Sequence, residues 1–130
     1  MVLERDFIEC GSHAVDAYVA VDAEGDKRAI MALNIYNYRI KKYIGAYAAA
    51  MGGCDILVWT GGVGENQWAT RRVVCENMEF MGMKIDVEKN EGMRGEEMVI
   101  STPDSKVTII VVPTDEEYMI ASDTMDILGK

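Results

Sequence analysis

Two short stretches of the sequence carry residue types that could bind a ligand. In the first, "TGGVGEN", three glycines (Gly61, Gly62 and Gly64) directly follow an apolar run. A glycine-rich turn at the start of a helix can offer backbone N–H groups to phosphate oxygens, because no side chain blocks the approach. The stretch is neither a Walker loop nor a GxGxxG motif. It therefore also fits a tight strand-to-helix turn with Asn66 as the helix N-cap.

The second stretch is "VVPTDEE", at the end of another apolar run. Its carboxylates would lie in the first turn of a helix, where the helix dipole favours negative charge. A capping box formed by Thr114 and Glu117 explains those two residues without any ligand, which leaves Glu116 unexplained. A carboxylate at the end of a parallel strand could hold a hydrated Mg²⁺ ion. Together the two stretches predict amides for phosphate and carboxylates for a cation, the combination that a Mg-nucleotide requires.

The predicted elements that position these stretches form an α/β layer structure in a single domain. Apolar residues at three- and four-residue spacing predict one long helix over 26–51, about 40 Å in length, ending at Gly52-Gly53. That length suggests packing against a larger body or against a second copy. The tyrosine stripe on this helix (Tyr36, Tyr43 and Tyr47) is more typical of core or interface than of a ligand site.

The other segments are assigned by their pattern and their breaks. We predict a short helix at 15–23, a buried strand at 55–60, a helix at 66–80, a short strand at 83–87 and a last helix at 114–128. Two strands at 97–101 and 106–112 are joined by a turn at 102–105, and the second strand has the continuous apolar pattern of a central strand covered on both faces.

Charge and composition exclude several classes of function. The chain of 130 residues has a net charge of −9 and a pI near 4.5, so it would repel nucleic-acid backbones. We expect the basic pairs Lys41-Lys42 and Arg71-Arg72 to be exposed helix positions. The three cysteines show no zinc spacing and are expected to be reduced thiols. Without a signal peptide or a membrane-length apolar run, we expect a cytoplasmic protein that does not bind a membrane.

Several longer motifs, taken together and in order, are characteristic of one family. The stretch "RIKKYIGAYAAAMGGCDILVWTGGVGEN" resembles the C-terminal domain of acetate kinase and its relatives, and so do "EFMGMKID", "ISTPDSKV" and "VVPTDEEYMIASDT". These are the acyl-phosphate-forming kinases of the actin and sugar-kinase superfamily. The resemblance implies a partial ribonuclease-H-like (actin-like ATPase) fold, with the long helix packed on a mixed sheet. It covers nearly the whole chain, from about Gly11 to Leu128, whereas residues 1–10 do not match.

The resemblance also implies a reaction and a set of site residues. Such kinases transfer the γ-phosphoryl group of ATP to acetate with the help of Mg²⁺, giving ADP and acetyl phosphate. The family's nucleotide loop corresponds to Gly61, Gly62, Val63, Gly64, Glu65 and Asn66, and its magnesium carboxylate corresponds to Glu116. The expected cofactors are therefore ATP or ADP and Mg²⁺. The expected partners are a nucleotide and either a second copy in a homodimer or a missing N-terminal portion.

Two departures from the family limit this expectation. Where family members carry an adenosine-contacting segment with acidic, aromatic and basic side chains, this chain has His13, Ala14 and Val15. The chain also corresponds to about the last third of a family member, so the groups that stabilise the transferring phosphoryl are missing. We therefore expect no catalytic residue and no independent activity in the isolated chain. The alternative is a non-catalytic dimerisation or interaction module derived from this domain.

Overall fold

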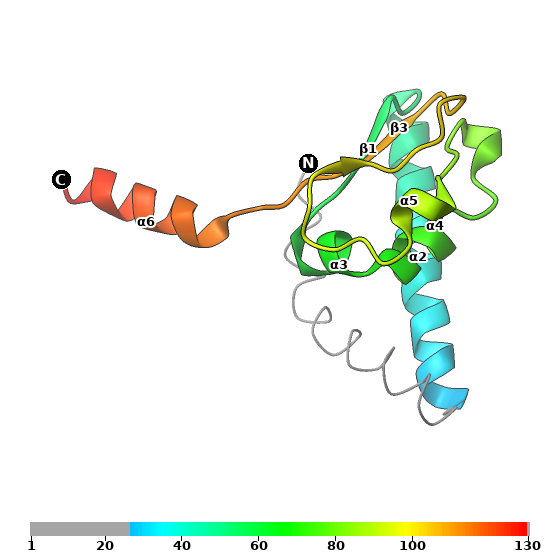
Figure 1. Ribbon diagram of the computed structural model, residues 1–130, viewed down its shortest axis with the longest axis horizontal. Helices are drawn as coiled ribbons and strands as arrows, with labels where there is room; N and C mark the ends of the chain where they lie inside the picture. Colours follow the sequence, from blue (N-terminus) through cyan, green and yellow to red (C-terminus); the bar gives the residue numbers. More distant parts are fainter. Residues whose placement is uncertain (1–26, 130) are drawn as a thin grey trace.

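The computed structural model describes residues 27–129 as helices packed on a small mixed sheet (Figure 1). The α/β class predicted from the sequence is confirmed. The predicted helix at 15–23 lies outside the described residues. In chain order the elements are α2 (Lys27–Met51), β1 (Ile56–Trp59), α3 (Gly61–Asn66), α4 (Trp68–Cys75), a 3₁₀ turn (Glu79–Met81), α5 (Val87–Asn90), β2 (Met98–Val99), β3 (Thr108–Val111) and α6 (Glu116–Ile127).

The sheet has the strand order β1-β3-β2, which places β3 at its centre. β1 runs parallel to β3, with Trp59 opposite Val111, and β2 pairs antiparallel with β3. The predicted pair of strands around the 102–105 turn is thus confirmed. Because β1 and β3 are parallel neighbours, the turns that follow them leave the sheet at the same edge.

One face of the sheet forms the core and the other is open among the described residues. Trp59 is 7% exposed, and Ile109 and Val111 are fully buried against α4 and the 83–107 region. On the other face Ile56 is 59% exposed and Val58 is 50% exposed. The prediction of strands covered on both faces was therefore wrong for the described part of the chain. An apolar open face of this kind is typical of a surface that another segment covers.

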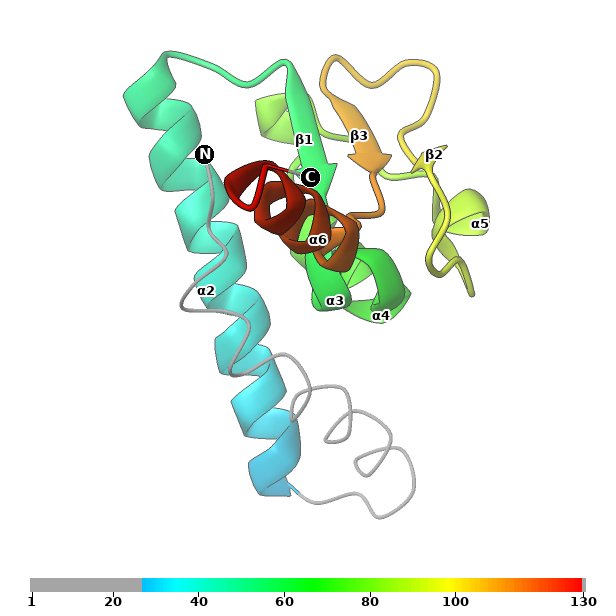
Figure 2. The ribbon, with the colours of Figure 1, turned by 90° about the vertical axis from the view of Figure 1, so that its left-hand side faces the viewer.

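The long helix α2 is confirmed, with 25 residues. It ends where Gly52 takes a left-handed conformation (φ 77°) and the Gly53 N–H donates to the Ala48 carbonyl at 2.9 Å. Only its C-terminal half lies beside the sheet, and its N-terminal half extends well beyond it (Figure 2). Ile40 and Ile44 in the half beside the sheet pack against the core.

The predicted helix over 66–80 is replaced by α4 and the 3₁₀ turn, and a separate short helix, α3, precedes them. Helix α3 starts at Gly61, so the glycine stretch is itself helical, and α4 starts only at Trp68. The break falls at Gln67, whose φ of −104° and ψ of 73° do not fit a helix. Asn66 is consequently the last residue of α3, and its prediction as an N-cap was wrong.

The predicted strand at 83–87 was also wrong. Met83 and Ile85 make only isolated bridges, to Val107 and Ser101, and α5 begins at Val87. Both bridging residues still join the core, with Met83 fully buried.

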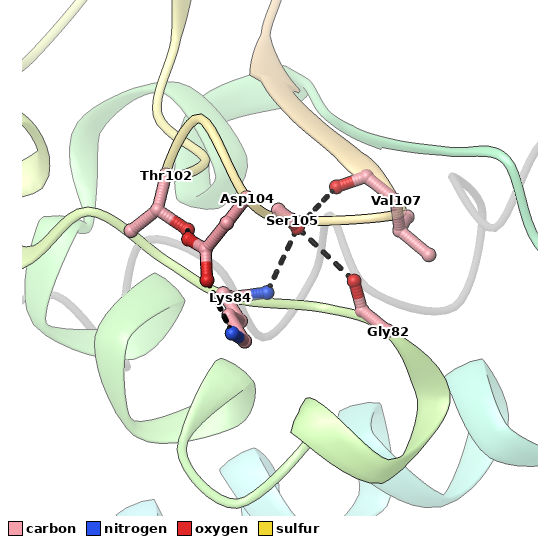
Figure 3. A network of polar contacts seen from close by, with 6 residues as sticks. All are labelled: Gly82, Lys84, Thr102, Asp104, Ser105 and Val107. Atoms are coloured by element: carbon pink, nitrogen blue, oxygen red, sulfur yellow. Dashed lines mark hydrogen bonds and ion pairs between the residues drawn. The ribbon is translucent and has the colours of Figure 1, made fainter.

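The hydroxyl group of Ser105 makes several contacts that hold the "STPDSK" turn, and the Thr102 hydroxyl adds a hydrogen bond to Asp104 at 2.7 Å (Figure 3). The backbone N–H of Lys84 donates to Ser105 Oγ at 3.0 Å, and this hydroxyl lies 2.7 Å from the Val107 carbonyl and 3.1 Å from that of Gly82. At the outer side of the turn, Lys84 Nζ pairs with the Asp104 carboxylate. This arrangement gives the motif a structural role away from the predicted ligand site.

The last helix, α6, stands away from the rest of the described chain (Figure 1). It contains no buried residue. Five of its apolar residues and the one that follows it are more than half exposed: Tyr118, Met119, Ile120, Met125, Ile127 and Leu128. Within residues 27–129, α6 therefore has packing partners only at its first turn.

Candidate functional site

An open hollow of about 320 Å³ lies at the edge of the sheet where β1 and β3 end. The two strands end side by side, and the Val112 N–H donates to the Trp59 carbonyl at 2.9 Å. The hollow is lined by Gly61, Gly62, Glu65, Thr114, Asp115, Glu116 and Glu117. Residues from both stretches thus line one hollow. Of the predicted site residues, Val63, Gly64 and Asn66 do not line the hollow.

A larger hollow of about 410 Å³ lies elsewhere, between the C-terminal end of α2 and the 3₁₀ turn. Its walls are small and apolar residues, among them Ala48, Phe80 and Met81, and none of its lining residues is charged. The chemistry that binds a phosphate or a cation is found only at the first of these two hollows.

The three glycines of the stretch differ in whether the described structure requires glycine at their positions. Gly61 takes a left-handed conformation, with φ at 70°, which favours glycine. Gly64 is buried against β1, because an added Cβ would lie 2.9 Å from the Trp59 carbonyl carbon. An added Cβ on Gly62 would meet nothing within 4 Å, and its backbone needs no left-handed conformation. No described packing requires glycine at 62, and this residue lines the hollow.

The Glu65 side chain joins the two halves of the site. Its Oε1 atom accepts hydrogen bonds from the Gly61 N–H, the Thr114 N–H and the Thr114 hydroxyl, each at 2.9 Å. Bonds to a carboxylate are stronger than bonds between neutral groups. Glu65 therefore ties the start of α3 to the segment that precedes α6, across 49 positions of sequence.

The start of α6 differs from the predicted capping box. Asp115 is the N-cap, and its carboxylate accepts from the Tyr118 N–H at 2.9 Å. Thr114 lies one residue too early to cap the helix and instead contacts Glu65. Glu116 and Glu117 thus occupy the first turn of α6, exposed at the rim of the hollow.

The chain matches a family model once its sequence is compared with known proteins. The model described as the Acetokinase family matches residues 9–122. The chain belongs to the acetokinase family. Over 111 residues it is 87% identical to the acetate kinase of Parabacteroides distasonis, covering 85% of this chain and 28% of that protein. Over 104 residues it is 72% identical to an acetate kinase of Porphyromonas gingivalis, covering 80% of this chain and 26% of the relative.

Solved structures of acetate kinases share the fold. The crystal structure of Porphyromonas gingivalis acetate kinase matches with a TM-score of 0.79 and 66% identity, covering 88% of this chain and 29% of that one. The acetate kinase of Entamoeba histolytica matches with a TM-score of 0.78 at 29% identity, covering 90% and 31%. The predicted partial actin-like ATPase fold is confirmed. This acetokinase-family chain spans less than a third of the length of these relatives.

Sequence reasoning missed one residue beside the site, Arg71. It was predicted to be an exposed helix position together with Arg72, but its side chain is fully buried, whereas Arg72 is exposed as predicted. Burial lowers the pKa of the Arg71 guanidinium to about 10, so it still carries its charge at neutral pH. In this family member it contacts the carbonyls of Gly64 and Glu65. Nothing in the local sequence around Arg71, a charged residue followed by a second arginine, indicated that its side chain would be buried.

The described residues also bear on metal binding, membrane insertion and cysteine chemistry in this acetokinase-family chain. Within residues 27–129, no three His, Cys, Asp or Glu side chains are grouped closely enough to hold a metal ion by themselves. No helix in that range is long and apolar enough to span a membrane. Cys54 and Cys75 are free thiols, as predicted. His13, Ala14 and Val15 lie outside the described residues, as does Cys10.

Proposed function

We propose that residues 1–130 form the C-terminal, nucleotide-binding domain of an acetate kinase-like cytoplasmic protein. The reaction of such a protein is reversible phosphoryl transfer from ATP to acetate, giving ADP and acetyl phosphate. The observation that carries the proposal is the shared hollow, in which Gly62 and Glu116 meet at the ends of two parallel strands. Ligands bind at this edge of open α/β sheets in general.

The residues present fit a nucleotide phosphate. Gly62 leaves open space where any other residue would place a side chain, and it lies at the start of α3, where the helix dipole favours an anion. The Gly61 N–H is already taken by the Glu65 carboxylate, so within the segment Gly61–Asn66 the contact with the nucleotide is assigned to the residues that follow Gly61, with Gly62 nearest to the nucleotide.

The residues also fit a magnesium ion that keeps most of its water. Mg²⁺ usually binds through one or two carboxylates together with the phosphates of a substrate, and it does not need an all-protein cage. Glu116 is an exposed carboxylate in the same hollow, and we assign the magnesium contact to it. When bound, the ion would neutralise phosphate charge; the part of Glu116 is to hold it beside the Gly61–Gly62 turn.

We further propose that the isolated chain has no independent catalytic activity. Phosphoryl transfer depends on charged groups that stabilise the transferring group from several sides. The described residues place on this hollow one carboxylate-rich rim and one glycine turn, and no Lys, Arg or His side chain lines it. A partner that supplies such groups would be the remaining part of an acetate kinase.

Calorimetric titration of the chain with ADP and Mg²⁺ tests the nucleotide site. We expect saturable binding that is lost in Gly62→Trp, because the indole would fill the hollow, and retained in Gly45→Ala, a glycine of α2 that does not line this hollow and has open space at its Cβ position. Both variants should first be shown to fold by circular dichroism. Absence of binding by the folded wild-type chain would refute the proposal. Acetyl phosphate formation from acetate and MgATP by the chain alone would refute the claim of inactivity.

A second candidate function is a non-catalytic dimerisation or interaction module. It is favoured by the exposed apolar residues of α6 and by the open sheet face around Ile56 and Val58. Contiguous exposed apolar surface of this kind commonly marks a protein–protein contact. A folded chain that is dimeric at micromolar concentration by light scattering and binds no MgADP would support this alternative, whereas a monomer would exclude the homodimer.

A further inference from the structure

The Arg71 side chain is the most unusual buried group in the described part of the molecule. It is fully buried, although arginine is almost never buried without a partner. No carboxylate of residues 27–129 lies within ion-pair distance of it. Its partners there are neutral oxygens and the Met93 sulfur, so within residues 27–129 the buried charge has no counter-ion. A group that is costly to bury needs an explanation in what it does there.

Two of the partners of Arg71 are carbonyl groups at the break in the helix, and one of them, that of Glu65, also accepts from the Gly95 N–H at 3.2 Å. Because Gln67 interrupts the helix, the carbonyls of Gly64 and Glu65 at the end of α3 lack the usual partners four residues on. Arg71 Nη1 donates to the Gly64 carbonyl at 2.7 Å and to the Glu65 carbonyl at 3.0 Å. A cation at the C-terminal end of a helix is also favoured by the helix dipole.

The other side of the guanidinium is anchored to a separate segment. Nε donates to Asn90 Oδ1 at 2.8 Å, and Nη2 donates to the Met93 carbonyl at 2.7 Å. The Asn90 side chain is itself held, because its Nδ2 donates to the Trp68 carbonyl at 2.9 Å. Arg71 thus uses its planar fork of donors to fix the end of α3 to the α5 segment, which a lysine could not reproduce with its single nitrogen.

We propose that Arg71 is a positioning residue of the nucleotide site, which holds α3 so that Gly61 and Gly62 stay at the hollow opposite Glu116. It touches no ligand; it acts through the backbone of Gly64 and Glu65. The hydrogen bond from Arg71 to the Glu65 carbonyl also orients Glu65, whose carboxylate binds Thr114 after the end of β3. The inference rests on the proposed nucleotide function, since it names what positions that site.

Two neighbouring arginines provide the test and its control. Arg71→Lys keeps the charge but loses the fork, whereas Arg72→Lys changes an exposed residue that only pairs with Glu76 at 3.7 Å. Amide hydrogen exchange is measured over 61–67 and over the core strand at 107–111, together with the MgADP dissociation constant. For Arg71→Lys we expect amide exchange at 61–67 to become at least about tenfold faster, because the free energy of one hydrogen bond from a charged group corresponds to about that factor. Exchange at 107–111 should stay within about threefold of wild type.

The MgADP dissociation constant should rise by about tenfold or more in Arg71→Lys and stay unchanged in Arg72→Lys. Unchanged exchange at 61–67, or an equal increase in both segments, would overturn the inference, because Arg71 would then be no positioning residue or only a core residue. If Arg71→Lys does not fold, Asn90→Ala, which removes one anchor of the fork, is measured in its place under the same criteria. If the wild-type chain binds no MgADP, the proposed function fails, while the exchange result still decides whether Arg71 holds the turn.

Discussion

Two glycines separated by one residue should respond in opposite ways to the same substitution. Gly64→Ala places a methyl group 2.9 Å from the carbonyl carbon and 3.3 Å from the Cα of Trp59. Both atoms belong to the backbone of β1, which is paired along its length with β3 and cannot move aside. Gly62→Ala places its methyl group in open space.

The expected magnitudes follow from these surroundings. Inserting a methyl group into a packed contact destabilises a protein by about 1–3 kcal/mol, so we expect Gly64→Ala to lower the free energy of unfolding by about 2 kcal/mol. For a domain of this size, that corresponds to a lower melting temperature by on the order of 10 °C. At Gly62 alanine fits the helical backbone and is the better helix former, so the change should be between zero and a gain of about 1 kcal/mol.

The assay combines urea unfolding with MgADP titration of the two variants and the wild type. Gly64→Ala should unfold at lower urea, whereas Gly62→Ala should keep or raise the midpoint and yet bind MgADP more weakly, because its methyl group faces the hollow. If Gly64→Ala were as stable as the wild type, the close approach of α3 to β1 would be wrong. If Gly62→Ala bound MgADP as tightly as the wild type, Gly62 would not be the nearest contact.

Four further changes test other parts of the structure. In a double-mutant cycle, Glu65→Gln removes the charge of the acceptor and Thr114→Val removes the hydroxyl donor, so the two should be coupled by about 1 kcal/mol in urea unfolding; additive effects would contradict the Glu65–Thr114 contact. Burial raises the pKa of Cys75 from about 9 to about 12, so the unfolded thiol ionises first as pH rises, and stability should fall by about 1.4 kcal/mol per pH unit above pH 9; Cys75→Ala should lack this part of the slope. Ser105→Ala should lower the free energy of unfolding by about 1–2 kcal/mol by leaving the half-buried Lys84 N–H unpaired, whereas the exposed Asp104→Asn, measured beside it, should change the urea midpoint little. Mg²⁺ should tighten ADP binding by less than about tenfold, with the gain lost in Glu116→Gln; a gain of a hundredfold would mean a rigid cation site.

The sequence predicts those parts of the fold that depend on local patterns. Helix α2 was predicted to within one residue, because its apolar spacing is long and two glycines end it. The strands near 55–60, 97–101 and 106–112 and the 102–105 turn also followed from apolar runs and turn residues, whereas the sheet order β1-β3-β2 was not predicted. The pairing of β1 beside β3 then brought Gly62 and Glu116 to one edge, as expected for parallel strands.

The parts that the sequence did not predict depend on contacts between distant segments. The helix break at Gln67 follows no proline or glycine, and it is supported by Arg71, whose partners include Asn90 and Met93, 19 and 22 positions away. The shift of the α6 cap from Thr114 to Asp115 has the same origin. Thr114 is a good capping residue by type, but Glu65, 49 positions earlier, binds it instead. Local propensity cannot report such partners.

These distant contacts are unequally divided between the two halves of the site. Helix α3, which contains the glycine stretch, is fixed at three points. Arg71 binds the Gly64 carbonyl, Gly64 packs against the Trp59 backbone, and Glu65 binds the Gly61 N–H. Glu116 is held only through the Glu65–Thr114 contact and the Asp115 cap, because α6 has no buried residue in the described structure. A preorganised group contributes more binding free energy than one that must be ordered when the ligand arrives. In the proposed nucleotide site, the phosphate half is therefore the preorganised one, and the proposed cation half would depend on a surface that covers the apolar residues of α6.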